Sequence, residues 1–161
     1  MRDIQSLDDI VPKKLPYDLD SAMGEAMRDI AILADKAGKK LAVESYGCDE
    51  SPRGLLDKAI LLRVLENVVS NALRYAEEKI EISFCVKDGM LSVTVQDDGS
   101  GFSKQALKSA CTPFFRESGK DGHMGLGLAI CTVLCGKHGG KLTVKNSEDG
   151  GAAVKFELSV N

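Results

Sequence analysis

The segment that most constrains the fold is a predicted β-hairpin in the middle of the chain, over residues 79–95. Apolar residues alternate with polar ones on both sides of a turn: Ile80, Ile82, Phe84 and Val86, then Leu91, Val93 and Val95. This alternation is typical of strands with one buried face, and the Asp88-Gly89 pair between them is a hairpin turn signal. The hairpin therefore needs a second layer over its apolar face.

Helical segments on both sides of the hairpin can supply that layer. One helix is predicted to end at Gly38, with Asp18 or Asp20 as its cap. A second is predicted to open at Gly54, with a buried stripe of Leu55, Leu62, Leu65, Val69 and Leu73. The remaining predicted elements are helices over 103–110 and 125–137 and strands over 40–45, 141–145 and 153–160. Together they predict an α/β two-layer sandwich, with several helices on one face of a mostly antiparallel sheet.

The length of 161 residues suits one domain. Residues 1–16 carry two prolines and scattered apolar residues, so we interpret them as a linker and 17–161 as the domain. A net charge of −3 argues against a nucleic-acid partner but not against a phosphorylated ligand. We expect no membrane contact by this domain, because no apolar run approaches the roughly 18 residues of a span.

The five cysteines are odd in number and include no CxxC pair, which favours reduced thiols in the cytosol. Cys131, Cys135 and His138 share one side of a predicted helix and could hold a metal. The alternative is that both cysteines are small apolar core residues.

The second predicted helix carries a polar face inside the segment ENVVSNALRYA. Asn67, Asn71 and Arg74 stand at i, i+4 and i+7 and therefore share one side. A carboxamide oxygen is a neutral ligand suited to a magnesium ion that also touches phosphates. The alternative is a solvated helix face, although two asparagines in mid-helix carry a propensity cost.

Two glycine-bearing segments follow. DDGSGF, from Asp97 to Phe102, lies where the second hairpin strand ends, so its first carboxylate could accept a hydrogen bond from an exocyclic amine such as that of adenine. A plain tight turn would use the same residues. Gly122, Gly125 and Gly127 precede or open a helix whose N-terminus favours phosphate. The chain contains neither a Walker A loop nor a dinucleotide-binding fingerprint.

The adjacent aromatics Phe114 and Phe115 stand between these glycine segments, in PFFR. One of them is expected to anchor the surrounding loop. Arg116 and Lys120 could reach a terminal phosphate or could be solvated charges.

The order of these segments resembles the catalytic ATP-binding domain of sensor histidine kinases, a branch of the GHKL superfamily. The resemblance covers residues 15–161: ENVVSNALRYA is similar to the N box, DDGSGF to the first glycine box, PFFR to the F box and GHMGLGLAI to the second glycine box. It implies the Bergerat fold, a mixed, mostly antiparallel sheet backed by three helices, with ATP and Mg²⁺ between the helices and a mobile lid.

The resemblance also implies roles for individual residues. Asn71 would coordinate the metal, and Asn67 would lie beside the metal and the phosphates. Asp97 would bind the adenine amine, and Gly99 and Gly101 would let the base approach. The other implied nucleotide contacts are Arg74, Tyr75, Phe102, Phe115, Arg116, Gly125, Leu126, Gly127 and Leu128.

One position bears on the reaction. ATP-hydrolysing relatives typically carry a glutamate base where this chain has Asn67, and Glu66 is about 100° round the helix. The site is therefore expected to hold ATP without rapid hydrolysis. Asp98 stands where the family commonly has asparagine, and would add a charge near the base. His138 is expected to be structural, at a helix end.

With no phosphoacceptor box in the chain, the γ-phosphoryl group is expected to pass to a histidine on a separate dimerisation domain, and this chain alone is not expected to phosphorylate itself. The implied setting is the cytoplasmic end of a membrane-anchored receptor with a response regulator as its partner. The alternatives are a stand-alone serine kinase of the anti-sigma-factor type and a degenerate module that binds no nucleotide.

Overall fold

The computed structural model describes residues 9–45, 52–109 and 123–161. Its main feature is a five-stranded sheet in the order β2-β4-β5-β7-β6. The strands are β2 (Lys40–Ser45), β4 (Lys79–Lys87), β5 (Met90–Asp97), β6 (Lys141–Asn146) and β7 (Ala152–Ser159). Only the β2–β4 pairing in this sheet is parallel, so the sheet is mixed and mostly antiparallel, as predicted.

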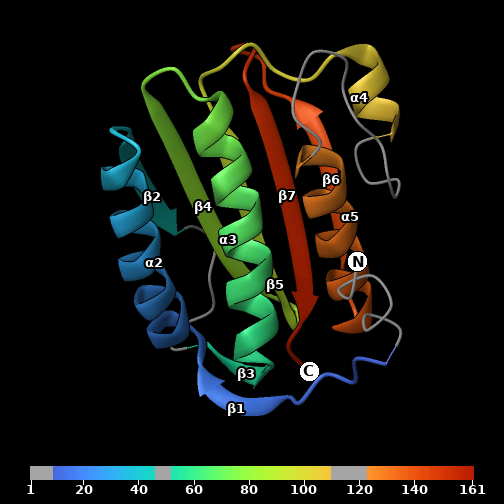
Figure 1. Cartoon of the computed structure of the whole chain (residues 1–161). Helices are drawn as coiled ribbons and strands as arrows, with labels where there is room; N and C mark the ends of the chain where they lie inside the picture. Colours follow the sequence, from blue (N-terminus) through green and yellow to red (C-terminus); the bar gives the residue numbers. More distant parts are fainter. Residues whose placement is uncertain (1–8, 46–51, 110–122) are drawn as a thin grey trace.

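Three long helices cover one face of this sheet, and together they form the second layer (Figure 1). They are α2 (Leu19–Lys36), α3 (Lys58–Tyr75) and α5 (His123–Lys137), with the short α4 (Lys104–Ser109) at the end of the sheet where β5 ends. The predicted two-layer α/β sandwich is confirmed.

The central hairpin forms as its alternation predicts. Ile82 pairs with Val95 and Phe84 with Val93, and these residues are buried against the helices, while the polar residues between them face the open side of the sheet. Asp88 and Gly89 both have positive φ, 54° and 75°, which is the requirement of a two-residue type I′ turn. On the next strand, β7, the fully buried Phe156 pairs with Val93 and extends the core.

The first helix begins where the cap predicts. The Asp18 carboxylate accepts a hydrogen bond from the backbone N–H of Ser21, and the chain turns at Gly38 with φ of 71°. An acceptor at the N-cap uses one of the backbone donors that a helix leaves open at its start.

The predicted start of the second helix is wrong. Gly54 and Leu55 belong to a strand, β3 (Arg53–Leu56), and α3 begins only after Asp57, whose carboxylate accepts from the N–H of Ile60 at 3.2 Å. Leu55 is therefore not part of the helical stripe, whereas Leu65, Val69 and Leu73 are buried as expected.

The strand β3 pairs antiparallel with β1 (Leu15–Asp18), and the two form a small separate sheet below the helices (Figure 1). A Cβ at Gly54 would meet the backbone oxygen and side chain of Val160, so the small sheet also lies against the end of the chain. Leu15 and Pro16, at the end of the predicted linker, pair with Leu56 and Leu55 in this small sheet.

Cys131 and Cys135 are buried in the core, and the Cys131 thiol donates to the backbone oxygen of Val64 at 3.7 Å. The two cysteines thus pack as small apolar core residues.

Across the described ranges, no helix combines the length and apolarity that crossing a membrane requires.

Candidate nucleotide site

The polar face of α3 forms one side of the candidate site. Asn67 and Asn71 are both half-buried, whereas Glu66 is exposed and therefore lies on a different side of the helix. The Asn67 carboxamide nitrogen donates to the backbone oxygen of Arg63 at 2.9 Å. This bond restrains the side chain and directs its nitrogen, rather than its oxygen, to the helix backbone. Arg74, one turn beyond Asn71, is exposed.

Asp97, the last residue of β5, is a buried carboxylate with only 6% of its surface exposed. Its Oδ1 accepts hydrogen bonds from the backbone N–H groups of Gly99 at 2.8 Å and Ala152 at 3.3 Å. Burial raises the pKa of Asp97 above its usual value, the two N–H groups oppose that shift, and the nearby charge of Asp98 adds to it. The side chain is thus held in place by two backbone donors, in surroundings that do not favour its charge.

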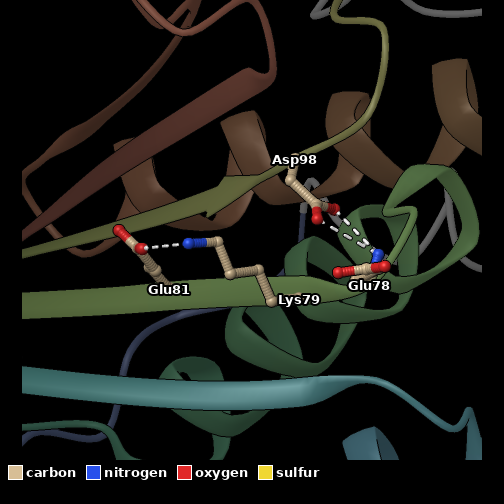
Figure 2. A network of polar contacts seen from close by, with 4 residues as sticks. All are labelled: Glu78, Lys79, Glu81 and Asp98. Atoms are coloured by element: carbon tan, nitrogen blue, oxygen red, sulfur yellow. Dashed lines mark hydrogen bonds and ion pairs between the residues drawn. The ribbon is translucent and has the colours of Figure 1, made fainter.

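Asp98 faces a different part of the molecule. Its carboxylate accepts from the backbone N–H of Glu77 at 2.8 Å and of Glu78 at 3.1 Å, in the connection between α3 and β4. Figure 2 shows the contact with Glu78. Desolvation raises the pKa of Asp98, but hydrogen bonds from the N–H groups of Glu78, Lys79 and Glu77 outweigh it and leave the pKa below its usual value. The extra charge expected at this position is therefore bound to the backbone after α3.

Gly99 is a glycine because another part of the backbone occupies the space of a side chain. A Cβ there would overlap the carbonyl oxygen of Tyr75, the last residue of α3. Together with Asp98, this close approach ties the end of α3 to the end of β5. The helix that carries Asn71 and the strand that carries Asp97 are consequently held in a fixed relation.

The second predicted glycine segment lies at the start of α5. The helix begins at His123, two residues before the predicted start at Gly125. A Cβ at Gly127 would meet no described atom within 4 Å. Leu128, one residue on, is buried in the core.

Phe114, Phe115, Arg116 and Lys120 lie outside the described residues, as do the side chains of residues 123–126, which include Gly125 and Leu126. Among those that are described, Tyr75 is half-buried against the core and Phe102 is 5% exposed.

Sequence reasoning missed the contribution of the turn between β6 and β7. The Asn146 carboxamide bonds to the backbone N–H and the backbone oxygen of Phe102. Ala152 supplies one of the two backbone N–H donors to Asp97. In sequence, Asn146 reads as an ordinary residue before a turn, and a backbone donor carries no sequence signal. Both contacts join residues far apart in the chain.

Comparison with known proteins agrees with this architecture. The family described as histidine kinase-, DNA gyrase B- and HSP90-like ATPase matches residues 56–161. The chain is 36% identical to the sensor histidine kinase CpxA of Escherichia coli K12 over 132 residues, 79% of this chain and 28% of CpxA. It is 34% identical to the sensor histidine kinase component HK1 of Mycobacterium tuberculosis over 105 residues, 64% of this chain and 62% of HK1. The chain therefore spans less than two thirds of each of these relatives.

Solved structures show the same fold. The catalytic domain of histidine kinase ThkA matches with a TM-score of 0.76 and 25% identity, over 92% of this chain and 97% of that one. Full-length ShkA in complex with AMPPNP matches in fold with a TM-score of 0.80, over 99% of this chain and 35% of ShkA. Fold, family match and relatives agree: the chain belongs to the histidine kinase-, DNA gyrase B- and HSP90-like ATPases, as a catalytic ATP-binding domain of the sensor histidine kinase type.

Proposed function

We propose that this chain binds ATP with magnesium and donates the γ-phosphoryl group to a histidine on a separate dimerisation domain of a longer sensor kinase. The observation that carries the proposal is the buried carboxylate of Asp97, held at the end of β5 beside the helix that bears Asn67 and Asn71. Family membership supports ATP as the ligand.

The adenine end of the ligand is assigned to Asp97. Its Oδ1 is engaged by the N–H groups of Gly99 and Ala152, so the other oxygen is the one that accepts from the adenine amine. We define the adenine corner as Asp97, Gly99, Gly101 and Phe102. Tyr75 lies next to it, because its backbone oxygen occupies the space of a side chain at Gly99. The buried position of Asp97 supports this role, because a hydrogen bond to a desolvated carboxylate contributes more than one made in water.

The phosphate end is assigned to the start of α5, with Gly125, Leu126, Gly127 and Leu128 as its proposed contacts. Free N–H groups and the helix dipole at that end favour phosphate. The Leu128 side chain itself belongs to the core. Arg74, Phe115 and Arg116 remain proposed contacts on the phosphate side.

The residues on α3 fit a magnesium ion. Asn71 offers a neutral carboxamide oxygen on a half-buried helix face, and Asn67 lies one turn before it. Magnesium retains several waters and takes few protein ligands when it also binds phosphates. Bound there, the ion would neutralise phosphate charge. The residues of the chain hold the nucleotide in position and keep its terminal phosphate accessible to an acceptor.

The chain is suited to donating a phosphoryl group rather than hydrolysing ATP. Asn67 has no proton-accepting carboxylate, and phosphoryl transfer needs chiefly positioning and charge neutralisation from the protein. The sequence holds two histidines, and His138 is 1% exposed with its Nε2 engaged by the backbone of Asp57. This supports an acceptor histidine on another domain.

The names of the relatives favour a histidine acceptor over the serine acceptor of the alternative. We propose that residues before β1 connect this domain to the phosphoacceptor domain, at the cytoplasmic end of a membrane-anchored receptor. A response regulator would be the next partner.

A calorimetric titration of the 161-residue chain tests the proposal. We expect ADP and a non-hydrolysable ATP analogue to bind with micromolar or weaker affinity, more tightly with Mg²⁺ than with EDTA. Asn71→Ala should abolish the difference between the two conditions, and Asp97→Ala should abolish binding in both. With labelled ATP, the chain alone should stay unlabelled and should transfer label to the purified phosphoacceptor domain of its parent kinase. A flat titration for the wild type would contradict the proposal.

A further inference from the structure

Asn146 recognises a single residue of the first glycine segment with both ends of its side chain. Its Oδ1 accepts from the backbone N–H of Phe102 at 2.7 Å, and its Nδ2 donates to the backbone oxygen of Phe102 at 2.9 Å. The side chain therefore acts as a neighbouring strand would, matching one acceptor and one donor to one residue. Two bonds to the same residue restrain its orientation as well as its position.

The residue before Phe102 is Gly101, and its lack of a side chain permits this contact. Gly101 has φ of 80°, in the left-handed region that favours glycine. A Cβ at Gly101 would lie 2.8 Å from the Asn146 Oδ1 and would overlap the backbone oxygen of Gly150 in the β6–β7 turn. The glycine thus has a reason independent of any ligand: it lets the segment come close to Asn146 and the turn.

The same turn also reaches Asp97. The N–H of Ala152 donates to the Asp97 Oδ1, and a Cβ at Gly151 would overlap the backbone oxygen of Asp97. Asn146 and Ala152 are paired in register at the mouth of this turn. One rigid turn therefore holds both ends of the segment from Asp97 to Phe102.

We propose that Asn146 is a positioning residue for adenine recognition, which sets the Gly101–Phe102 peptide relative to the Asp97 carboxylate. This rests on the proposed function, in which the adenine corner binds the base. Without the carboxamide, residues 101 and 102 are free to shift while Asp97 stays fixed by the N–H groups of Gly99 and Ala152. The backbone surface of residues 101 and 102, against which the base would pack, is then no longer fixed. Asp97 itself remains in place.

The variant Asn146→Ala tests this in the 161-residue chain, with Thr143→Ala as its control on an exposed position of the same strand. From the loss of two hydrogen bonds, we expect ADP to bind about fivefold to tenfold more weakly to Asn146→Ala. The loss of affinity should be the same in Mg²⁺ and in EDTA, because the adenine corner contacts the base and the metal is assigned to Asn71. Thr143→Ala should bind ADP as the wild type does.

Asn146→Asp supplies a second measurement, the pH dependence of ADP affinity, which a purely structural role of Asn146 would leave unchanged. Its ionised carboxylate can accept from the Phe102 N–H but repels the Phe102 backbone oxygen. Its protonated form again supplies a donor to that oxygen. The ratio of wild-type to variant ADP affinity should therefore fall toward one as pH is lowered from 7 to about 4, where an aspartate with the ordinary pKa of about 3.9 takes up its proton. This variant also decides the matter if Asn146→Ala does not fold.

The outcomes separate the two proposals. If the wild type binds no ADP, the proposed function fails. If the wild type binds ADP and Asn146→Ala has unchanged affinity but a lower melting temperature, Asn146 only stabilises the fold and the inference is overturned. A loss of affinity that appears only with Mg²⁺, or an Asn146→Asp ratio that does not change with pH, would overturn it as well.

Discussion

The imidazole of His138 accepts a hydrogen bond from the backbone N–H of Asp57, with 2.9 Å between Nε2 and the nitrogen. The bond joins the residue after α5 to the N-cap of α3. The Asp57 carboxylate in turn accepts from the N–H of Lys13 at 2.8 Å, so the segment before β1 is bound to the start of α3. This bond confirms the predicted structural role of His138 at a helix end.

This bond makes stability depend on pH. Burial lowers the pKa of His138, against smaller raising effects of nearby backbone groups and of the Asp57 charge, while the Lys14 charge lowers it further. The unfolded chain takes up a proton near the usual histidine pKa of about 6.5, and the folded chain resists it. Stability from this residue is therefore present above that pH and lost as pH falls below it.

Urea unfolding at pH 7.5 and at pH 5.5 measures the effect. We expect the wild type to lose more stability between these values than His138→Gln, whose side-chain oxygen can accept from Asp57 without titrating. Equal losses in the two proteins would show that His138 does not carry this dependence.

Asp97→Asn separates stability from binding. The raised pKa of Asp97 means that its folded environment disfavours the charge, and a carboxamide oxygen can still accept from Gly99 and Ala152. We expect the variant to melt no lower than the wild type at pH 7 without nucleotide. ADP affinity should fall by about 10-fold to 150-fold, the range for one hydrogen bond to a charged group. A variant that binds ADP normally would show that Asp97 does not contact the base.

Asp98→Ala removes the acceptor that the N–H groups of Glu77 and Glu78 share. We expect a lower melting temperature, because these donors lose their partner and the end of α3 loosens from β5. Asp98→Asn should melt closer to the wild type, since one oxygen still accepts. If Asp98→Ala melts as the wild type does, the hydrogen bonds that Asp98 accepts from Glu77 and Glu78 do not stabilise the fold.

Two glycines should respond in opposite directions to the same change. Gly24 is exposed within α2, and a Cβ there would meet nothing within 4 Å, so Gly24→Ala should stabilise by about 0.5–1 kcal/mol through helix propensity. Gly99→Ala should destabilise strongly, because its Cβ would overlap the Tyr75 oxygen. Chemical denaturation of both variants at one pH checks the contrast.

The limits of the sequence are clearest around Gly54. Leu55 and Leu56 continue an apolar spacing that suits a helix, yet they form β3, because β1 supplies a pairing partner from residues 15–18. That partner lies about 40 positions earlier, so no local pattern announces it. The same holds for the Asn146 carboxamide, which bonds to a residue 44 positions away.

The sequence alone determined the features that depend on neighbours in the chain. Alternation and an Asp-Gly pair specified the hairpin, spacing specified the apolar stripes, and the order of the glycine segments specified the family. The tertiary structure decided what depends on contacts between distant segments: that Gly99 and Gly101 admit backbone and side chain of the protein itself, that Asp98 binds the end of α3, and that Asn146 sets the peptide beside Asp97. Local propensities act over a few residues, whereas such contacts exist only once the layers have packed.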